Sequence, residues 1–395
     1  MVTQQLETLD EEVFEAALAG RGAVAEWERT FADLVCGVKY AFGTASGTMA
    51  LYFALKAVGV QVGDEVIVPA LDWYAATAAT LHSCAIPVFA DVEPNLSTIS
   101  PLSVEERITK RTKAIIATHL FGYLCDMHAL RSLADRYGIA LVEDCAQALE
   151  ATCHGKKVGA WGDVACFSFG VGKLLSCGEG GMIVTNRDDL AERILALSTH
   201  PLRQEWEGME VNPFTLRAPL NSIAIVHLLK EWEQLEKRLT ERREAFERLS
   251  AALAETKVLR PLLPREGCRQ SPYRFVALAP TKRVKRSIMA ALLNAGLPVS
   301  DVFGAKLLTE ELAEALKLKK GQLSWHPFPD RLADTASLPC PNAKAFLGRA
   351  LVIDWRIGLD SEALNCLRET LREWSVRGSV KSPANEVKRD GNYLR

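Results

Sequence analysis

Short apolar runs alternate with amphipathic stretches from residue 65 onward, and this rhythm limits the fold of the chain more than any other feature of the sequence. The runs are rich in Val, Ile and Ala without polar alternation, which is typical of strands buried on both faces. The stretches between them have helical spacing, so the pattern predicts strand–helix–strand units and a parallel sheet covered by helices. The expected strands lie at residues 65–68, 87–90, 113–117 and 139–142, and the expected helices at residues 74–84, 104–109 and 127–137.

Sheets of this kind bind their ligands beyond the carboxyl ends of the strands. The residues that directly follow the predicted strands are therefore the first candidates for a functional site. These are residues 69–73, Asp91, residues 119–122 and residues 143–147.

The 395-residue chain is too long for one ordinary hydrophobic core, so two domains are expected. Apolar residues at helical spacing predict one long bridging helix over residues 221–254. Beyond it we expect a strand at residues 273–278 and helices at residues 287–295 and 361–374. The predicted division is a large domain over residues 1–240, a small domain over residues 241–375 and a loose tail over residues 376–395.

Charge and cysteine content narrow the classes of partner. The 47 basic and 49 acidic residues nearly balance, so a small-molecule partner is expected rather than nucleic acid or an anionic membrane. Residues 1–5 lack the features of a signal peptide and no stretch has the length of a membrane span, so a cytoplasmic protein is predicted. The ten cysteines contain no C-x-x-C pair, which predicts reduced, packed thiols and no metal site.

The first segment with chemical potential, residues 45–51, opens an apolar helical run with Ser46, Gly47 and Thr48. Free backbone N–H groups at a helix start form a phosphate site, and the helix dipole favours the anion. The alternative interpretation is an ordinary Ser/Thr N-cap.

The second segment, residues 141–148, is an apolar strand that ends in Glu143 and Asp144. A carboxylate at this place can hold a protonated ring nitrogen, because opposite charges at contact distance favour the charged forms of both groups. The alternative is a capping Asp beside a solvated Glu.

The third segment, residues 167–181, has Lys173 among glycines and apolar residues. Desolvation favours the neutral amine that forms a Schiff base with a carbonyl compound. Glycine also lets the backbone approach a flat cofactor closely. The alternative is a surface lysine in a glycine loop; the P-loop and G-x-G-x-x-G patterns of nucleotide sites are absent from the sequence.

Together, the order and spacing of these segments resemble the DegT/DnrJ/EryC1/StrS family of sugar aminotransferases, which depend on pyridoxal 5'-phosphate (PLP) and have PLP fold type I. The resemblance implies an α/β fold with a central, mostly parallel sheet, helices on both faces and a smaller C-terminal α+β domain. It covers residues 43–51, 64–91, 143–181 and 340–343.

The resemblance also implies roles for individual residues. Lys173 would carry PLP as a Schiff base, Asp144 would pair with its pyridine nitrogen and Gln147 would lie near its ring hydroxyl. Trp73 has the position of the aromatic group that stacks on the ring, the alternative being a Trp packed at the sheet edge. The residues expected to hold the phosphate are Ser46, Gly47, Thr48 and Ser168.

The chain departs from the family pattern at two places. Where the family has Gly-x-Asn-x-Arg, with the Asn reaching the phosphate of the neighbouring subunit, this chain has Thr215 within residues 213–217. We expect Thr215 to replace that amide, with Asn212 and Asn221 as alternatives. The Gly-Val-Gly-Lys-Leu run around Lys173, together with the Leu-Asp-Trp run at residues 71–73, is more similar to the branches that act on keto-cyclitols such as scyllo-inosose, or to aminohydroxybenzoate synthases, than to typical nucleotide-sugar enzymes.

The function implied is an aminotransferase that moves an amino group from glutamate or glutamine to a ketone of a keto-sugar or keto-cyclitol, in the biosynthesis of an amino sugar, aminocyclitol or antibiotic-like product. The resemblance also implies a homodimer with shared active sites. Two alternatives remain open: a PLP-dependent dehydratase or aromatising synthase of the same family, and a catalytically silent partner protein of this fold.

Overall fold

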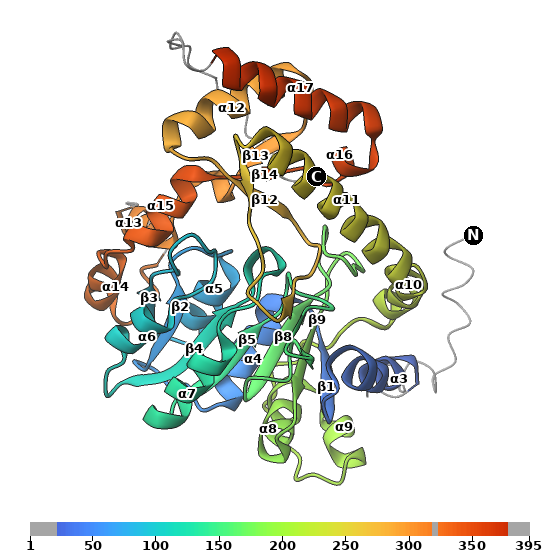
Figure 1. Cartoon of the computed structure of the whole chain (residues 1–395). Helices are drawn as coiled ribbons and strands as arrows, with labels where there is room; N and C mark the ends of the chain where they lie inside the picture. The colour runs from blue at the N-terminus through green and yellow to red at the C-terminus, as the bar shows by residue number, and fades with distance from the viewer. Residues whose placement is uncertain (1–21, 318–322, 378–395) are drawn as a thin grey trace. The chain divides into compact units, whose positions relative to one another are not determined.

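The computed structural model describes residues 22–317 and 323–377. Its contacts divide the chain into two compact units (Figure 1). The first unit consists of Met1–Leu235, Pro264–Ser271 and Leu307–Ala343, and the second of Glu236–Leu263, Pro272–Lys306 and Lys344–Arg395.

A seven-stranded sheet in the order β1-β9-β8-β5-β4-β2-β3 forms the centre of the first unit. Strands β3, β2, β4, β5 and β8 pair in parallel, whereas β9 and β1 join antiparallel. Every residue of β2, β3 and β9 is buried, and since successive side chains point to opposite faces, both faces are covered. The strands are β1 Tyr40–Thr44, β2 Glu65–Pro69, β3 Ile86–Ala90, β4 Thr112–Thr118, β5 Ala140–Asp144, β8 Val164–Ser168 and β9 Gly181–Thr185. The predicted α/β fold with a mostly parallel sheet is confirmed.

In the first unit, helices alternate with many of the strands along the sequence. In α7, Asp126 caps the start by accepting from the N–H of Ala129, and Gly138 ends it in the left-handed conformation. The helices predicted between the strands correspond to α5, α6 and α7. The helices are α3 Ala23–Thr30, α4 Gly47–Ala57, α5 Ala75–His82, α6 Pro101–Arg107, α7 Met127–Tyr137, α8 Asp188–Ser198, α9 Pro201–Trp206, α10 Ser222–Glu233, α13 Leu308–Lys317 and α14 Pro329–Ala336, with a π-helix at Phe31–Cys36 and a 3-10 turn at Leu120–Gly122.

The second unit is built on a four-stranded antiparallel sheet in the order β10-β12-β14-β13. Its core joins apolar residues of this sheet with those of the helices around it. The strands are β10 Arg260–Pro261, β12 Phe275–Leu278, β13 Val299–Asp301 and β14 Ala350–Ile353, and the helices are α11 Leu235–Thr256, α12 Lys282–Asn294, α16 Arg356–Leu359 and α17 Ser361–Arg377; a 3-10 turn lies at Phe303–Ala305. The predicted strand at residues 273–278 and the helices at 287–295 and 361–374 correspond to β12, α12 and α17.

The single bridging helix predicted over residues 221–254 is wrong. The chain forms α10 and α11 as separate helices, and Gln234 ends α10 with a tight turn in which its N–H donates to the carbonyl of Glu231 at 3.3 Å. The sequence has no Pro or Gly at this break, and apolar residues continue at helical spacing across it. The break is therefore not visible in the sequence pattern.

The division into units also differs from the predicted boundary at residue 240. Two segments that we assigned to the small domain, Pro264–Ser271 and Leu307–Ala343, group with the first unit. One reason is that the carboxylate of Asp91 accepts the N–H groups of Asn342 and Ala343 at 2.8 and 2.7 Å, at the start of α15 (Pro341–Arg349). The predicted tail lies outside the described residues except for its first two positions, which end α17; residues 1–5 lie outside them as well.

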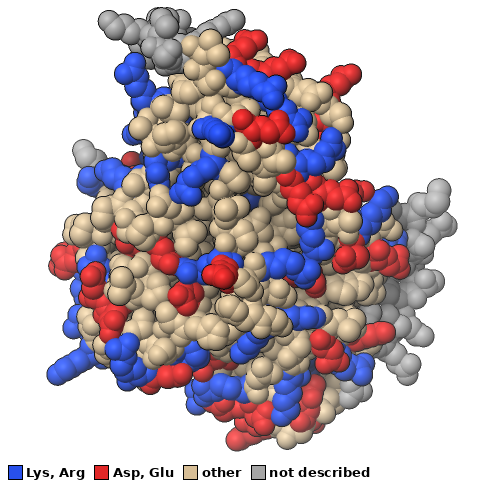
Figure 2. All heavy atoms as spheres, in the orientation of Figure 1, with Lys and Arg blue, Asp and Glu red and all other residues tan. Residues whose placement is uncertain are grey.

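Among residues 22–317 and 323–377, no helix combines the length and the apolar character that crossing a bilayer requires. On the face drawn in Figure 2, basic and acidic side chains are interspersed rather than gathered by sign.

Candidate active site

The carboxyl ends of three neighbouring strands bring acidic and hydroxyl side chains together. Thr118 ends β4 and Asp144 ends β5, and the two lie opposite each other in the parallel register. Asp72 follows β2, the next strand in the sheet, and Oγ1 of Thr118 donates to its Oδ2 at 2.5 Å. All three side chains are buried. This edge is where an open parallel sheet binds its ligand.

The buried surroundings of the Asp144 carboxyl group favour interaction with a cation. Its Oδ1 accepts the N–H of Ala146 at 3.0 Å. Burial raises the pKa of Asp144 above its usual range, while the bond from Ala146 and the charge of Lys173 act in the opposite direction. A cation held here would therefore replace lost hydration and favour the ionised carboxylate.

Lys173 lies in the glycine-rich loop after β8 and is half-buried. Its N–H donates to the carbonyl of Gly170 at 3.2 Å, and Gly172 before it has a φ of 81°, a left-handed conformation that favours glycine. Its ammonium group interacts electrostatically with Asp144 and Asp72. The structure thus places Lys173 and Asp144, 29 positions apart in sequence, close enough to interact electrostatically.

The start of α4 lies beside the end of β8. Ser46 is the N-cap, with its Oγ accepting the N–H of Met49 at 3.2 Å, so the N-cap interpretation holds for this residue. A Cβ on Gly47 would lie 2.7 Å from Cβ of Ser168, so only glycine lets the two segments approach this closely. Thr48 is exposed in the same first helical turn. The arrangement joins unpaired helix-start N–H groups with the hydroxyl of Ser168, which suits an anion.

The side chain of Gln147 is held by a hydrogen bond from the backbone of Phe121, which has an unusual conformation. Its Oε1 accepts the N–H of Phe121 at 2.8 Å, and both residues are buried. Phe121 has a φ of 60°, a left-handed conformation that non-glycine residues rarely adopt and that is often found at functional sites. Because the oxygen is taken by Phe121, the amide group of Gln147 is held in one orientation.

Trp73 and Thr215, two residues predicted to bind the cofactor, have surroundings unlike those of the other predicted site residues. The indole of Trp73 is 52% exposed and meets the ring of Tyr74 edge-on at 5.1 Å, so it is not a tryptophan packed into the sheet edge. Thr215 donates its hydroxyl to the carbonyl of Leu197 at 3.0 Å. The alternatives are engaged too: Asn212 donates to a carbonyl of α8, and Asn221 caps α10.

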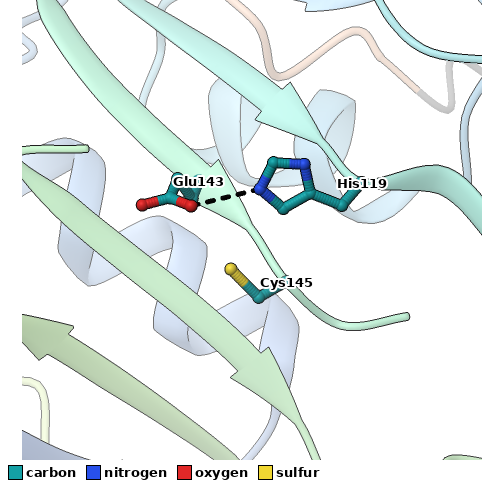
Figure 3. A group of neighbouring side chains, drawn as sticks. All are labelled: His119, Glu143 and Cys145. Atoms are coloured by element: carbon teal, nitrogen blue, oxygen red, sulfur yellow. Dashed lines mark hydrogen bonds and ion pairs between the residues drawn. The ribbon is translucent and has the colours of Figure 1, made fainter. Parts of the chain in front are cut away.

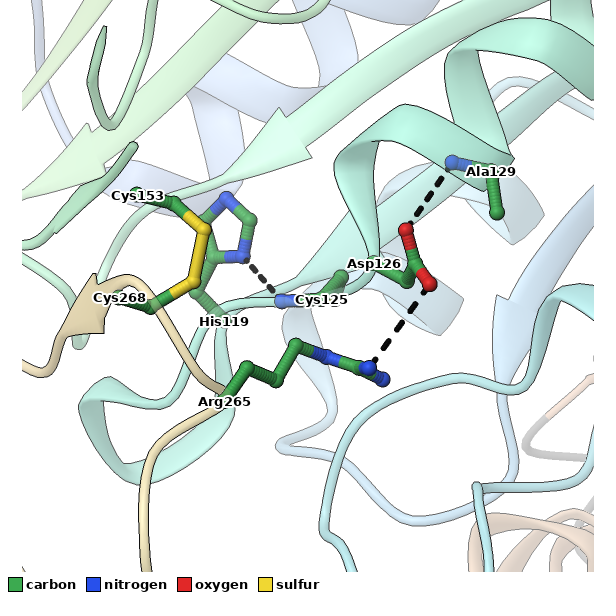
Figure 4. Close-up of a disulfide and its surroundings, with 7 residues drawn as sticks. All are labelled: His119, Cys125, Asp126, Ala129, Cys153, Arg265 and Cys268. Carbon is green, nitrogen blue, oxygen red and sulfur yellow. Dashed lines mark hydrogen bonds and ion pairs between the residues drawn. A yellow bond between two sulfur atoms is a disulfide. The ribbon is translucent and has the colours of Figure 1, made fainter. Parts of the chain in front are cut away.

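Glu143 is part of a buried network that the sequence did not reveal (Figure 3). One carboxylate oxygen accepts the N–H groups of Trp161 and Gly162 at 2.7 Å each, and the other accepts Gly159 N–H at 3.0 Å and faces Nε2 of His119 at 3.1 Å. Nδ1 of His119 accepts the N–H of Cys125 at 3.2 Å, so its Nε2 carries the proton (Figure 4). The alternative of a solvated Glu143 is wrong, because this side chain has no exposed surface.

His119, Glu143 and Cys145 have potential ligand atoms within 4.8 Å of one another, the spacing of a metal centre. The hydrogen bonds already occupy the carboxylate and both ring nitrogens. Burial holds the pKa of the Cys145 thiol well above its usual range. Glu143 and His119 form a hydrogen-bonded clamp at the ends of β4 and β5, directly beside Asp144.

A disulfide joins Cys153 and Cys268, so the prediction that all ten cysteines are reduced thiols is wrong (Figure 4). The two residues face each other in a small antiparallel sheet made of β6 Thr152–Cys153, β7 Lys156–Lys157 and β11 Cys268–Arg269. The partners are 115 residues apart, and no local spacing pattern marks them. The disulfide and an ion pair of Arg265 with Glu93 hold the segment Pro264–Ser271 against the rest of the first unit.

Comparison with known proteins agrees with the predicted family. The sequence model of the DegT/DnrJ/EryC1/StrS aminotransferase family matches residues 6–372. A 3-amino-5-hydroxybenzoic acid synthase of known structure is similar with a TM-score of 0.75 and 27% identity, over 91% of this chain and 92% of that one. These matches confirm the predicted family and its PLP fold type I.

Two relatives show how far sequence similarity extends. The L-glutamine:2-deoxy-scyllo-inosose aminotransferase of Streptoalloteichus tenebrarius is 36% identical over 295 residues, which is 70% of this chain and 68% of that protein. The GDP-perosamine synthase of Caulobacter vibrioides is 44% identical over 186 residues, 46% of this chain and only 50% of the relative.

Proposed function

Because the chain belongs to the DegT/DnrJ/EryC1/StrS aminotransferase family, we propose that it transfers an amino group from glutamate or glutamine to a ketone of a keto-sugar or keto-cyclitol, with PLP bound at Lys173. The observation that carries the proposal is the meeting of Lys173 and Asp144 at the carboxyl edge of the sheet, next to the start of α4. A primary amine, a buried acid and an anion site together fit a phosphorylated pyridine aldehyde.

Each group of the site has a part that its surroundings support. The first turn of α4, from Gly47, and the hydroxyl of Ser168 would bind the phosphate, with the N-cap Ser46 fixing the helix start. Asp144 would hold the proton of the ring nitrogen by its negative charge. Gln147, oriented by Phe121, would hydrogen-bond the ring hydroxyl. The exposed face of the Trp73 indole would cover the ring.

PLP supplies a ring that withdraws electrons from the carbon bearing the donor's amino group. Nζ of Lys173, once released, then removes the proton from that carbon of glutamate or glutamine. In the second half of the reaction it delivers a proton to the carbon that was the ketone of the acceptor.

The direct test replaces Lys173 by Ala. We expect the variant to lose the visible absorption of covalently held PLP and at least about a thousandfold in turnover of a donor and keto-cyclitol pair, because both covalent attachment and proton transfer are lost. Lys110→Ala, a change of an exposed lysine, is the matched control. Normal turnover in the Lys173 variant would refute the assignment.

The acceptor class rests on the relatives, whose names include a 2-deoxy-scyllo-inosose aminotransferase and a GDP-perosamine synthase. We propose a keto-cyclitol first, since the cyclitol relative matches the larger share of this chain. A screen of keto-cyclitols against nucleotide-linked keto-sugars, following the return of the visible absorption of bound PLP, separates the two. Similarity to the aminohydroxybenzoic acid synthase favours an aromatising reaction as the second candidate; products that have gained an amino group without losing water would exclude it.

We also propose that two chains form a dimer through the first unit. Large apolar side chains are exposed there, with Phe214 at 93%, Ile223 at 70% and Val226 at 57%. Ile223 and Val226 lie three positions apart, and therefore on one face of α10. Light scattering should give twice the chain mass, and Ile223→Asp should yield monomers; a monomeric wild type would refute the proposal.

A further inference from the structure

Asp72 is a buried carboxyl group at the site for which no sequence pattern suggests a role. It lies three residues after the end of β2 and is only 5% exposed. Its Oδ1 accepts the N–H of Trp73 at 2.7 Å, and its Oδ2 accepts the hydroxyl of Thr118 at 2.5 Å. Both oxygens are thus anchored, so the carboxyl group is held in one orientation.

The position of Asp72 pairs it with Asp144. Strands β2, β4 and β5 are neighbours, and Thr118 at the end of β4 lies opposite Asp144 in the register while holding Asp72 by its hydroxyl. Two carboxyl groups therefore stand at one dry sheet edge. Burial, and next the charge of Asp144, raise the pKa of Asp72 well above its usual range, whereas Thr118, Trp73 and the charge of Lys173 act in the opposite direction.

The thiol of Cys125 also interacts with Asp72, and burial raises the pKa of this thiol so that it stays neutral. The charge on Asp72 therefore responds to Asp144 and to Lys173. Without a cofactor, the two buried carboxyl groups face the ammonium group of Lys173, and burial together with the charge of Asp144 favours the protonated form of Asp72. A protonated ring nitrogen beside Asp144 would offset the charge of Asp144, which is the second cause of the raised pKa of Asp72 after burial, and would thus favour the ionised form of Asp72.

We propose that Asp72 is a positioning residue of the cofactor site, which fixes the backbone of Trp73 with one oxygen and provides, beside Asp144, a second carboxylate for the cations of the loaded site. The inference rests on the proposed function, since it needs PLP at Lys173. The first role sets the angle of the indole over the ring. The second role stabilises the protonated nitrogen atoms at the site, because a nearby anion favours the charged form of a basic group.

Two variants separate these roles. Asp72→Asn keeps an oxygen for the N–H of Trp73 but removes the charge, whereas Asp72→Ala removes both. In the holoenzyme, the pH midpoint of the visible absorption of bound PLP should fall by about 1 unit in both variants, since one anionic neighbour is lost. The visible circular dichroism of the cofactor should persist in Asp72→Asn and fall by about half or more in Asp72→Ala, because only the latter frees the Trp73 backbone.

Protein stripped of cofactor gives an independent measurement. The infrared band of a protonated, buried carboxyl group should be present in the wild type and absent in Asp72→Asn. A residue with only a structural role would change stability but would leave the pH midpoint of the holoenzyme unchanged. A midpoint within about 0.2 unit of wild type in Asp72→Asn would overturn the charge role.

Should Asp72→Asn not fold, Thr118→Val decides, because it keeps the shape of the side chain and removes the hydroxyl that favours ionised Asp72. Its midpoint should fall by about 0.5 unit, and an unchanged midpoint overturns the proposal. The variant Lys173→Ala distinguishes failure of the proposed function from failure of the role proposed for Asp72. If that variant still holds PLP covalently, the proposed function fails; if it does not, while Asp72→Asn titrates as wild type, only the role of Asp72 fails.

Discussion

Replacing Glu143 by Gln tests how strongly the buried clamp beside Asp144 supports the fold. The carboxylate accepts the N–H groups of Trp161, Gly162 and Gly159 and the Nε2–H of His119 at 2.7 to 3.1 Å. A glutamine has one acceptor oxygen and one NH₂ group, which donates only. If the oxygen keeps Trp161 and Gly162, the NH₂ group then faces two donors, Gly159 and His119.

The cost follows from these two lost acceptors. A buried donor left without a partner costs about 1–3 kcal/mol, so two cost about 2–6 kcal/mol, and we expect a loss near 4 kcal/mol. His119 cannot relieve the conflict by moving its proton to Nδ1, because Nδ1 accepts the N–H of Cys125. A change of tautomer would only transfer the unsatisfied donor to Cys125. The expected loss is a large part of the 5–15 kcal/mol typical of a folded domain.

The assay is urea unfolding of the wild type and Glu143→Gln, with Glu192→Gln as the matched change of an exposed residue. The control should stay within about 0.5 kcal/mol of wild type. A loss below about 1 kcal/mol in Glu143→Gln would refute the reasoning, since it would mean that the donors find other partners.

The pH dependence offers a second check on Glu143. Burial alone would raise its pKa, but the bonds from His119, Gly162 and Gly159 prevail and hold it below the ordinary value of 4.5. A folded-state pKa below the unfolded one adds stability that is present above pH 4.5 and is lost as the pH falls through the folded-state value. The unfolding free energies of wild type and Glu143→Gln should therefore converge in acid; a constant difference down to about pH 2 would contradict this.

Two further predictions concern anchors of the first unit. Peptide mapping without reductant should recover Cys153 linked to Cys268, and Cys268→Ser should lower the unfolding free energy by up to about 4.8 kcal/mol, given the 115-residue separation; peptides without the link would contradict it. Arg203→Met should cost about 3–5 kcal/mol, because Glu28, bound bidentately at 2.7 and 3.1 Å, would remain as a buried uncompensated charge. The double variant with Glu28→Gln should recover part of this in urea unfolding, and equal losses in single and double variants would argue against the pair.

The sequence was sufficient to predict the parallel strands β2, β3, β4 and β5 of the central sheet. The strands are continuous apolar runs, so burial of both faces is visible locally. The chemical residues follow these runs directly: Asp144 is the last residue of β5, and Lys173 lies in the loop after β8. The carboxyl-edge rule selected Asp144 for the site, whereas Lys173 was selected for its glycine-rich surroundings and by the family resemblance.

What the sequence could not predict depends on contacts between distant segments. Asp72 was within a segment selected for inspection, but its importance arises from the sheet order, which puts β4 and β5 beside β2. Glu143 is adjacent to Asp144 and was taken as solvated in one interpretation, because its N–H partners at residues 159–162 come from a later loop. The break at Gln234 has no Pro or Gly to announce it.

The alternation of the two units along the chain constrains how the protein is made. The polypeptide passes between the units five times, so neither unit is a continuous stretch of sequence. A nascent chain that has reached Leu235 has all seven strands of the central sheet, yet Asp91 and Cys153 still await Asn342 and Cys268. Completion of the first unit thus requires the synthesis of two of the three segments of the second unit, Glu236–Leu263 and Pro272–Lys306. A gene fragment cut at the apparent boundary would encode Lys173 without the anchors that complete the first unit.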